Sequence, residues 1–155
     1  MKIKEVYVKQ TPILEALKLS DNVIVEHYRQ SGASDKGRVL SPDVESYLTL
    51  ERLGKLKTIV AFDEDEAIGY CAILLYRPTH YEMLAASVDA LWLSIEHRST
   101  TNAGFKLLKE AEKIALDAGA QILSISSQAN NSKYRKFLRL TGYNEDYVVH
   151  TKTLR

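Results

Sequence analysis

Hydrophobic and polar residues follow two different periods along this chain, and the two periods predict alternating strands and helices. Apolar residues at every second position, or in short apolar runs, are typical of strands. Such segments lie at residues 3–8, 57–62, 67–76, 83–95, 121–126 and 143–153. Apolar residues three and four positions apart are typical of amphipathic helices. Those segments lie at residues 11–28, 41–54, 107–118 and 131–140.

The boundaries of the predicted helices are marked by residues that start or stop a helix. Thr11 and Pro12 favour a helix start, and residues 20–22 favour a break inside that first helical segment. Gly119 and Gly142 stop the third and the fourth segments. The third segment has the clearest pattern. Its apolar positions are Leu107, Leu108, Ala111, Ile114, Ala115 and Ala118.

The order of these elements predicts one α/β domain, of the α+β type, over residues 1–155. A mixed, largely antiparallel sheet of about six strands, flanked by about four helices with one strand–helix–strand crossover, buries the apolar face of every element. A chain of 155 residues is long enough to bury a single core. The acidic residues 63–66 between the second and third strands predict a hairpin connection.

Composition and charge argue against several classes of function. The formal net charge is +1, which gives no support to nucleic acid or an anionic membrane as a partner. Cys71 stands alone in an apolar strand, which predicts a core residue and no internal disulfide. The 4 histidines show no metal-ligand spacing, and no apolar run approaches the ~18 residues of a membrane span. The histidine spacing therefore predicts no metal site. Because the first residues lack the apolar region of a signal peptide, we expect a cytoplasmic protein.

The segment from Asp89 to Leu108 carries the strongest candidate for chemistry. An apolar strand ends near Arg98, a run of small residues follows, and an amphipathic helix begins at once. Backbone N–H groups at a helix start are unpaired within the helix and lie at the positive end of its dipole. Small side chains let an anion approach these groups, so the loop predicts a cradle for a phosphate. The alternative is an ordinary strand-to-helix turn capped by Thr100 or Thr101.

This order of elements, with the cradle after the fourth strand, resembles the GNAT superfamily of acyl-CoA-dependent N-acetyltransferases. The family pattern in the cradle is Gln/Arg-x-x-Gly-x-Gly/Ala. Here Arg98 and Ala103 match the pattern, and Thr101 replaces the first glycine. A second landmark is an asparagine that opens a helix, followed eleven residues later by Gly-Phe or Gly-Tyr. Asn131 and the pair Gly142-Tyr143 satisfy it.

The resemblance implies the GNAT fold, with the sheet splayed between strands 4 and 5, and acetyl-CoA as cosubstrate. In the family, the pyrophosphate lies on the loop amides, the pantetheine arm pairs with the end of the fourth strand, and an asparagine holds the arm from the other side. The corresponding residues here are Leu91, Trp92, Leu93, Arg98, Ser99, Thr100, Thr101, Asn102, Ala103, Gly104 and Asn131. Asn131 can also act as a plain helix cap. The side chain of Trp92 points away from those of Leu91 and Leu93, which predicts a core position under a helix.

The resemblance also implies transfer of an acetyl group to a primary amine, which needs a proton acceptor. A free lysine amine has a pKa of about 10.4, so it must lose a proton before it attacks. The candidate bases are Asp89, His80 and Glu82, and deprotonation relayed by water is the alternative. Asp89 faces the same side as Leu91 and Leu93 if its strand is regular.

The proton donor is the place where the sequence departs most from the family. Many relatives carry a tyrosine four positions before the glycine of the second landmark, and this position is Leu138 here. Tyr134 lies one helical turn earlier on the same face, so its hydroxyl can replace the missing one. The alternative is that Tyr134 packs on the sheet.

Two rival functions stay open at this stage. One is a non-catalytic GNAT-fold module that binds acyl-CoA or a protein partner, which Thr101 and Leu138 favour. The other is a regulator that binds phosphate or a nucleotide, and it rests on the cradle alone. For an enzyme, the sequence leaves the acceptor open between a small molecule and a protein. Dimers are common in the family, so a homodimer is one expected arrangement, and residues 80–93 resemble phage- and prophage-encoded members.

Overall fold

The computed structural model describes residues 2–154, with the side chain of Ser34 left aside, and these residues form two compact units. The first unit is Met1–Ser124, and the second is Ile125–Arg155, which contains the helix α5 (Ser132–Leu140). Each unit is described by itself below. The single domain expected over residues 1–155 stays a prediction.

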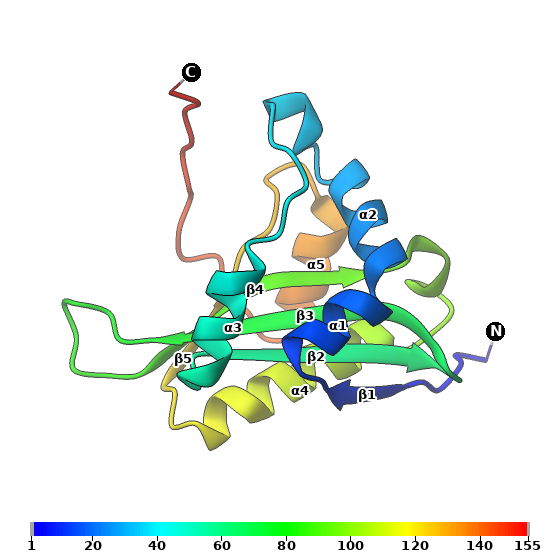
Figure 1. Cartoon of the computed structure of the whole chain (residues 1–155), viewed down its shortest axis with the longest axis horizontal. Helices are drawn as coiled ribbons and strands as arrows, with labels where there is room; N and C mark the ends of the chain where they lie inside the picture. Colours follow the sequence, from blue (N-terminus) through cyan, green and yellow to red (C-terminus); the bar gives the residue numbers. More distant parts are fainter. Residues whose placement is uncertain (1, 155) are drawn as a thin grey trace. The chain divides into compact units, whose positions relative to one another are not determined.

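A five-stranded sheet organises the fold, in the order β1-β2-β3-β4-β5 (Figure 1). Its strands are β1 (Tyr7–Gln10), β2 (Leu56–Asp63), β3 (Glu66–Tyr76), β4 (Ala85–Leu93) and β5 (Ile122–Ile125). The first four strands pair antiparallel, each with its neighbour in this order. A tight turn joins β2 to β3 at the acidic segment, where the sequence predicts a hairpin. The expected splay between the fourth and fifth strands stays a prediction.

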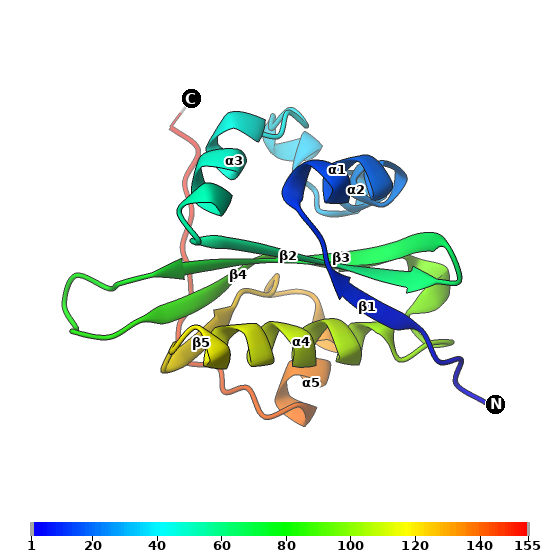
Figure 2. The same cartoon turned by 60° about the horizontal axis from the view of Figure 1, so that its bottom comes forward.

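Helices cover both faces of the sheet in the first unit. The helices α1 (Ile13–Leu19), α2 (Asp21–Gln30) and α3 (Val44–Arg52) lie on one face, and α4 (Ala103–Asp117) lies on the other (Figure 2). Two short 3-10 helices, η1 (Ser34–Lys36) and η2 (Ile95–His97), lie in the connections. The predicted α/β class is confirmed, with five strands and five α-helices among the described residues. None of these helices is long and apolar enough to cross a membrane.

The buried side of each layer follows the period read from the sequence. On the α1–α3 face, one cluster joins Ile13, Leu56 and Ala72, and another joins Ala16, Val60 and Phe62. On the other face, α4 buries Leu107, Leu108 and Ala111 completely. Cys71 is fully buried in β3, and burial raises the pKa of its thiol to about 12. Its predicted role as a core residue is therefore confirmed.

Local capping explains where the first helices begin and end. Ser20 ends α1 and directly precedes α2, so the predicted break at residues 20–22 is confirmed. The side chain of Asp43 accepts a hydrogen bond from the Ser46 N–H at 3.1 Å and caps α3. A carboxylate in this position satisfies an N–H group that the helix leaves unpaired. Because Asp43 supplies the cap, α3 begins later than the predicted start at residue 41.

The first strand lies further along the chain than the predicted segment 3–8. β1 begins at Tyr7, whereas Lys4 forms an isolated parallel bridge with Thr101. The Lys4 N–H donates to the Thr100 carbonyl at 2.9 Å. The alternating pattern at residues 3–8 therefore serves two pairings, one with β2 and one with the loop that precedes α4.

The strand expected at residues 143–153 is absent, and this prediction was wrong. Residues 144–154 have no regular structure and make no backbone hydrogen bond within the described part of the chain. Tyr147, Val148 and Val149 are 91%, 80% and 76% exposed. An alternating pattern becomes a strand only when another strand offers N–H and C=O partners. Without such a partner, the sheet has five strands instead of about six.

Candidate active site

A β-bulge in β4 sets the geometry of the candidate site. The pairing register between β3 and β4 shifts so that Asp89 has no partner residue on β3. The Tyr47 hydroxyl of α3 donates to Asp89 Oδ2 at 3.4 Å, which places this carboxylate on the α1–α3 side. Leu93 faces α4 instead, because its Cδ2 lies 3.8 Å from the position that a Cβ on Gly104 would take. The prediction that Asp89 shares a side with Leu91 and Leu93 was wrong, because a bulge reverses the regular alternation.

The loop between β4 and α4 presents unpaired backbone N–H groups. It runs from Ser94 through η2 and a turn to Asn102, the residue before α4. Within residues 2–154, no protein acceptor pairs with the N–H groups of Ser99, Thr100, Gly104 and Phe105. Those of Gly104 and Phe105 belong to the first turn of α4, at the positive end of its dipole. These open N–H groups are the ones that an anion cradle needs, and anion binding here stays a prediction.

Thr101 stands at the position where the sequence pattern expects glycine, and its side chain faces the protein. Its hydroxyl donates to the His97 carbonyl at 2.7 Å and accepts from the Ala103 N–H at 3.3 Å. Thr101 is 8% exposed. Among the described non-glycine residues only Glu64 has a positive φ, so the backbone of Thr101 is ordinary. The hydroxyl thus caps the start of α4. It does not bond any of the open N–H groups of the loop.

The N-terminal segment braces the same loop. Asn102 Oδ1 accepts a hydrogen bond from the Val6 N–H at 3.3 Å. Lys106 Nζ donates to the Val6 carbonyl at 2.6 Å and to Glu5 Oε2 at 2.9 Å. Hydrogen bonds from Lys106 and then from Asn102 hold the pKa of Glu5 below its usual range. The side chain of Asn102 therefore bonds the N-terminal segment, and Asn102 itself is the last residue of the loop before α4.

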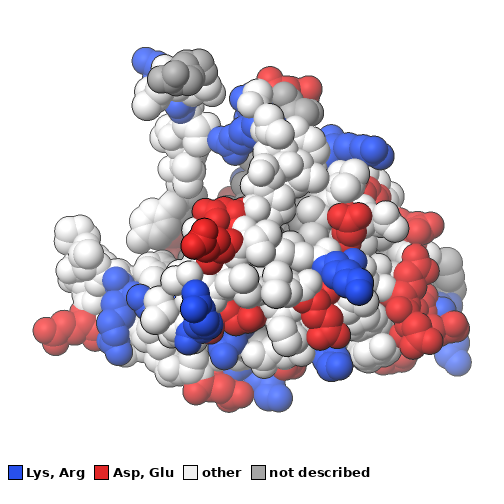
Figure 3. Space-filling view, in the orientation of Figure 1, with Lys and Arg blue, Asp and Glu red and all other residues white. Residues whose placement is uncertain are grey.

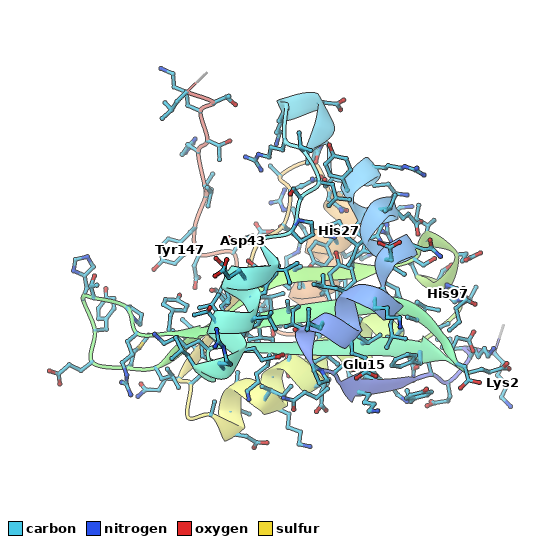
Figure 4. The ribbon with its side chains drawn as sticks, in the orientation of Figure 1. Lys2, Glu15, His27, Asp43, His97 and Tyr147 are labelled. Carbon is cyan, nitrogen blue, oxygen red and sulfur yellow. The ribbon has the colours of Figure 1, made fainter. Side chains whose placement is uncertain are left out.

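Arg98, Trp92 and His27 form a stacked cluster on the α1–α3 side. Arg98 Cζ lies 4.1 Å from the centroid of the Trp92 ring, and its Nε donates to the Leu93 carbonyl at 2.8 Å. The His27 ring stacks on Trp92 with centroids 4.6 Å apart and planes 6° apart. Figure 4 shows His27 on α2. Trp92 therefore lies under a helix, as predicted. Arg98, which belongs to the loop between β4 and α4, thus contacts the last two residues of β4, Trp92 and Leu93.

Sequence reasoning missed the next pair, His27 and Tyr70, which share a hydrogen bond through His27 Nδ1. Burial, and then the positive charge of Arg98, lower the pKa of His27. Burial first, and then nearby groups, raise the pKa of Tyr70. Both side chains are therefore neutral near pH 7. The two residues come from α2 and β3, and no local pattern links them, because only the register that pairs Tyr70 with Trp92 brings them together.

A pocket of about 310 Å³ lies on the α1–α3 side of the sheet. Its walls come from α1, α2, α3, the loop between α2 and α3, and the strands β2–β4, and they include Tyr28, Tyr47, Tyr70 and Ala90. Ser20 and Thr58 also line it, and they are 1% and 4% exposed. Neither hydroxyl has a hydrogen-bond partner within the described chain. Asp89 lies beside this pocket, because it directly precedes Ala90 and is bonded to Tyr47, and both of these residues line the pocket.

The charges around the pocket are mixed. Figure 3 shows Lys, Arg, Asp and Glu side chains of both signs on this face, with acidic side chains gathered at its right-hand edge. The described lining residues include one arginine, Arg38, and no aspartate, glutamate or lysine. Across residues 2–154, no three His, Cys, Asp or Glu residues gather into a group that could hold a metal ion.

The structure does not bring His80 and Glu82 to this site. Both are exposed in the loop between β3 and β4, beyond Ala85, where β4 begins (Figure 1). Asp89 comes four residues after Ala85, and four residues of strand span about 13 Å. Of the three candidate bases, only Asp89 lies at the bulge and beside the pocket.

The second unit carries the two remaining predicted residues, Asn131 and Tyr134. Asn131 Oδ1 accepts a hydrogen bond from the Tyr134 N–H at 3.1 Å, so Asn131 caps α5. The Tyr134 ring stacks with Phe137, with centroids 6.4 Å apart. Leu138 is buried. Capping is one of the two roles expected for Asn131, and its role toward a cofactor stays a prediction.

Comparisons with known proteins agree with this architecture. The sequence profile described as the Acetyltransferase (GNAT) family matches residues 24–143. No curated protein sequence matches the chain.

Solved structures with a similar fold cover almost the whole chain. One is a ribosomal-protein-alanine N-acetyltransferase from Brucella melitensis biovar Abortus 2308, with 12% identity, a TM-score of 0.73, and 97% of this chain and 99% of that chain covered. Another is the aminoglycoside acetyltransferase meta-AAC0020 from an uncultured soil metagenomic sample, with 17% identity, a TM-score of 0.74, and 97% of both chains covered. A third is AAC(6')-Iy in complex with the bisubstrate analog CoA-S-monomethyl-acetylneamine, with 12% identity, a TM-score of 0.75, and 98% and 99% covered. At these identities the likeness establishes the fold.

Proposed function

The chain belongs to the acetyltransferase (GNAT) family, and we propose that it transfers an acetyl group from acetyl-CoA to a primary amine. Membership of this family makes the protein an acyltransferase with acetyl-CoA as its cosubstrate. The amine acceptor and the roles of individual residues are the proposed part. The non-catalytic module is not favoured by the family match, and the nucleotide-binding regulator rests on the cradle alone.

The observation that carries the proposal is the set of open N–H groups in the cradle. Ser99, Thr100, Gly104 and Phe105 offer four such groups, with two of them in the first turn of α4. Several amides together with the helix dipole can hold a pyrophosphate without a lysine or arginine. Thr101, Asn102 and Ala103 hold the conformation of this loop through their hydrogen bonds with the rest of the protein.

The end of β4 supplies the second proposed contact with the cosubstrate. The backbone of Leu91, Trp92 and Leu93 would pair with the pantetheine arm in the manner of an added strand. Arg98 supports this role indirectly, because it bonds the Leu93 carbonyl and stacks on Trp92. A backbone N–H near Leu93 would polarise the thioester carbonyl. A contact of Asn131 with the cosubstrate, which the family resemblance implies, also belongs to this proposal.

Acetyl-CoA supplies an activated acetyl group, whose transfer forms a C–N bond to the amine and breaks the C–S bond to the CoA sulfur. The amine must lose a proton, because a free amine is charged near pH 7. Asp89, four residues before Leu93, is the proposed carboxylate that attracts the incoming ammonium group toward the end of β4, and water carries the proton of the amine to solvent. Tyr47 holds the Asp89 carboxylate, and burial, followed by the charge of Asp89, raises the pKa of Tyr47 so that it stays a donor. His80 and Glu82 are not part of this proposal.

Tyr134 is the proposed proton donor to the departing CoA thiolate, in place of the tyrosine that Leu138 replaces. Tyr134→Phe removes only the hydroxyl, and a general acid typically contributes about 10²–10⁴-fold. We expect kcat to fall by about a hundredfold with an unchanged KM for acetyl-CoA. A fall below about threefold would leave solvent as the proton source.

A charge placed in the cradle tests the function directly, with Gly104→Glu as the test and Gly104→Gln as its matched control. A Cβ at this position would meet only Leu93 Cδ2, at 3.8 Å, which is ordinary van der Waals contact, so neither substitution creates a clash at its Cβ. An acidic residue in the first turn is compatible with the helix dipole. At a hundredfold excess over its Kd, acetyl-CoA should stabilise the unmodified protein by about 2.7 kcal/mol.

Thermal unfolding with and without acetyl-CoA measures this stabilisation. We expect Gly104→Glu to keep the melting temperature of the free protein and to lose the shift, because its carboxylate repels the phosphates. Gly104→Gln should retain most of the shift. If millimolar acetyl-CoA leaves the melting temperature of the unmodified protein unchanged, the proposal is contradicted.

Three further expectations belong to this proposal and stay predictions. They are a cytoplasmic location, a homodimer, and a relation to phage- or prophage-encoded members of the family.

A further inference from the structure

His27 of α2 lies beside the end of β4, where the thioester is proposed to bind. Its ring stacks on Trp92, with centroids 4.6 Å apart, and Trp92 directly precedes Leu93. Neighbouring residues of a strand lie about 3.3 Å apart along it. His27 is therefore held closer along β4 to the proposed thioester position than Asp89, which precedes Leu93 by four residues.

The two nitrogens of the His27 ring have different surroundings. Nδ1 shares a hydrogen bond with the hydroxyl of Tyr70, which β3 pairs with Trp92 of β4. Nε2 has no hydrogen-bond partner within residues 2–154, and it is not closed off from solvent as the unpaired Nδ1 of His97 is. His27 as a whole is only partly buried. One nitrogen thus fixes the ring, and the other is open to a ligand.

The ring is neutral near pH 7 because of the groups around the pair of His27 and Tyr70. The charged and titratable groups come from α2, α3, β4 and the loop before α4; they are Glu26, Tyr47, Asp89 and Arg98. Burial, and then the charge of Arg98, lower the pKa of His27. Burial, and then nearby groups, raise the pKa of Tyr70. A neutral imidazole bonded to a protonated tyrosine can accept a proton at its open nitrogen.

The α1–α3 side of β4 is the side from which an amine can approach. Leu93 is buried and faces α4, so its own side of the strand is covered. The other side carries the pocket of about 310 Å³, which Tyr70 helps to line. The Tyr70 hydroxyl bonds His27 and so connects the wall of this pocket to the imidazole. An amine on this side would therefore meet His27 near the proposed thioester position.

We propose that His27 Nε2 is the catalytic base that removes the second proton of the amine during acetyl transfer, with Tyr70 as its positioning residue. The inference rests on the proposed function, in which water carries the first proton to solvent. In this assignment Nδ1–H donates to the Tyr70 hydroxyl oxygen, which leaves the lone pair on Nε2.

Each proton and bond of the transfer is then accounted for. The neutral amine forms the C–N bond, and its nitrogen becomes positively charged. This nitrogen is far more acidic than a free ammonium group, so a neutral imidazole can take its proton. The C–S bond breaks, and Tyr134 protonates the CoA thiolate. His27 returns its proton to solvent, which the charge of Arg98 favours, and solvent restores the proton of Tyr134.

Diethyl pyrocarbonate tests the position of His27 without an acceptor, because this reagent modifies neutral imidazole nitrogens that are open to solvent. Peptide mass spectrometry follows the 4 histidines separately. At a hundredfold excess over its Kd, acetyl-CoA occupies about 99% of the protein, so it should slow modification of His27 by more than about tenfold. The exposed His80 should react at an unchanged rate.

His27→Gln tests the chemistry, because glutamine can bond Tyr70 but cannot accept the proton. Release of CoA is measured with tyramine, spermidine, kanamycin and a peptide that begins with alanine. For the amine with the highest kcat/KM, we expect His27→Gln to lower kcat/KM by about a hundredfold. The variant should keep the shift of the melting temperature with acetyl-CoA. His80→Gln is the matched control, which should keep both properties.

The pH profile distinguishes a base from a structural residue. Below the pKa of His27, log kcat/KM should rise with a slope of about two, one proton from the amine and one from the imidazole, and above it with a slope of about one. His27→Gln should show a slope of about one over the whole range from about pH 5 to about pH 8. Tyr70→Phe should move the bend to lower pH, because the imidazolium loses the acceptor of its Nδ1–H.

The outcomes separate this inference from the proposed function. If acetyl-CoA does not protect His27, or if His27→Gln keeps both the rate and the bend in the pH profile, the base is overturned and acetyl transfer stands. Protection of His27 without acetylation of any of these amines would support its position at the thioester and count against acetyl transfer.

Discussion

At the scale of single residues, neighbours decide which side chains of the candidate site carry a charge. The His27 ring packs against Trp92 and shares a hydrogen bond with Tyr70. The guanidinium of Arg98 lies over the same Trp92 ring. Burial and that positive charge both favour the neutral imidazole, which is why the pKa of His27 is lowered. Burial lowers the pKa of Arg98, and the negative charge of Glu26 raises it. A proton added to His27 would place a second positive charge in this cluster.

The pH dependence of stability should report this arrangement. The folded-state pKa of His27 is lowered, so the unfolded chain binds its proton first as the pH falls, and stability is lost. The loss begins near the ordinary histidine pKa of about 6.5 and continues down to the folded-state pKa. We expect the unmodified protein to lose more stability than His27→Phe between about pH 7.5 and about pH 5 in urea unfolding. Phenylalanine preserves a stacked ring and removes the titration.

The same change at an exposed position, His80→Phe, controls for the loss of one imidazole. If His27→Phe and the unmodified protein lose equal stability over this range, the assignment of the pH dependence to the cluster is refuted.

At the scale of elements, the start of α4 depends on one hydroxyl group. Thr101 bonds both η2 and the first residue of α4, and it is buried. The neighbouring Thr100 also has a bonded hydroxyl, which donates to the Glu96 carbonyl at 2.8 Å, but Thr100 is exposed. Two adjacent threonines with similar bonds thus differ mainly in burial.

Substitution of each threonine by valine should separate burial from bonding. We expect Thr101→Val to lower the free energy of unfolding by about 1–2 kcal/mol, because it removes a helix cap and leaves a buried N–H unpaired. Thr100→Val should stay within about 0.5 kcal/mol of the unmodified protein. Urea unfolding of both variants gives the comparison, and equal losses would contradict a special role for Thr101.

The elements that the sequence predicts well are those whose pattern is local. The helix from 103 to 117 and the strands β2 and β3 carry a complete apolar face within one segment, so period alone locates them. The bulge at Asp89 depends on the register of two strands, and the tail after Tyr143 depends on a partner strand that is absent from the described chain. The pocket joins residues from Ile13 to Ala90, and no window of sequence contains it.

At the scale of the whole molecule, burial varies steeply along the chain. Six residues of β2 and β3 are completely buried; these are Leu56, Ile59, Val60, Ala61, Cys71 and Ile73. Residues 144–154 are exposed and have no backbone hydrogen bond within the described part of the chain. Stability against local opening should follow the same gradient, since exposed segments with few bonds open most easily.

Amide hydrogen exchange measures this gradient directly. We expect the slowest exchange in β2 and β3, and exchange close to the rate of an unfolded peptide at residues 144–154. Acetyl-CoA should slow exchange at residues 99–105, where the open N–H groups lie. Slow exchange with alternating protection at residues 143–153 would instead restore the sixth strand that the sequence pattern predicts.

The brace between the N-terminal segment and the cradle also sets an order of events during synthesis. Val6 bonds Asn102 and Lys106, which follow it by 96 and 100 positions. Ribosomes add about 5–20 residues per second, so these partners appear about 5–20 s after Val6 has been made. The cradle cannot be completed before that moment. Stabilisation by acetyl-CoA at the cradle therefore begins only after residues 99–106 have been made.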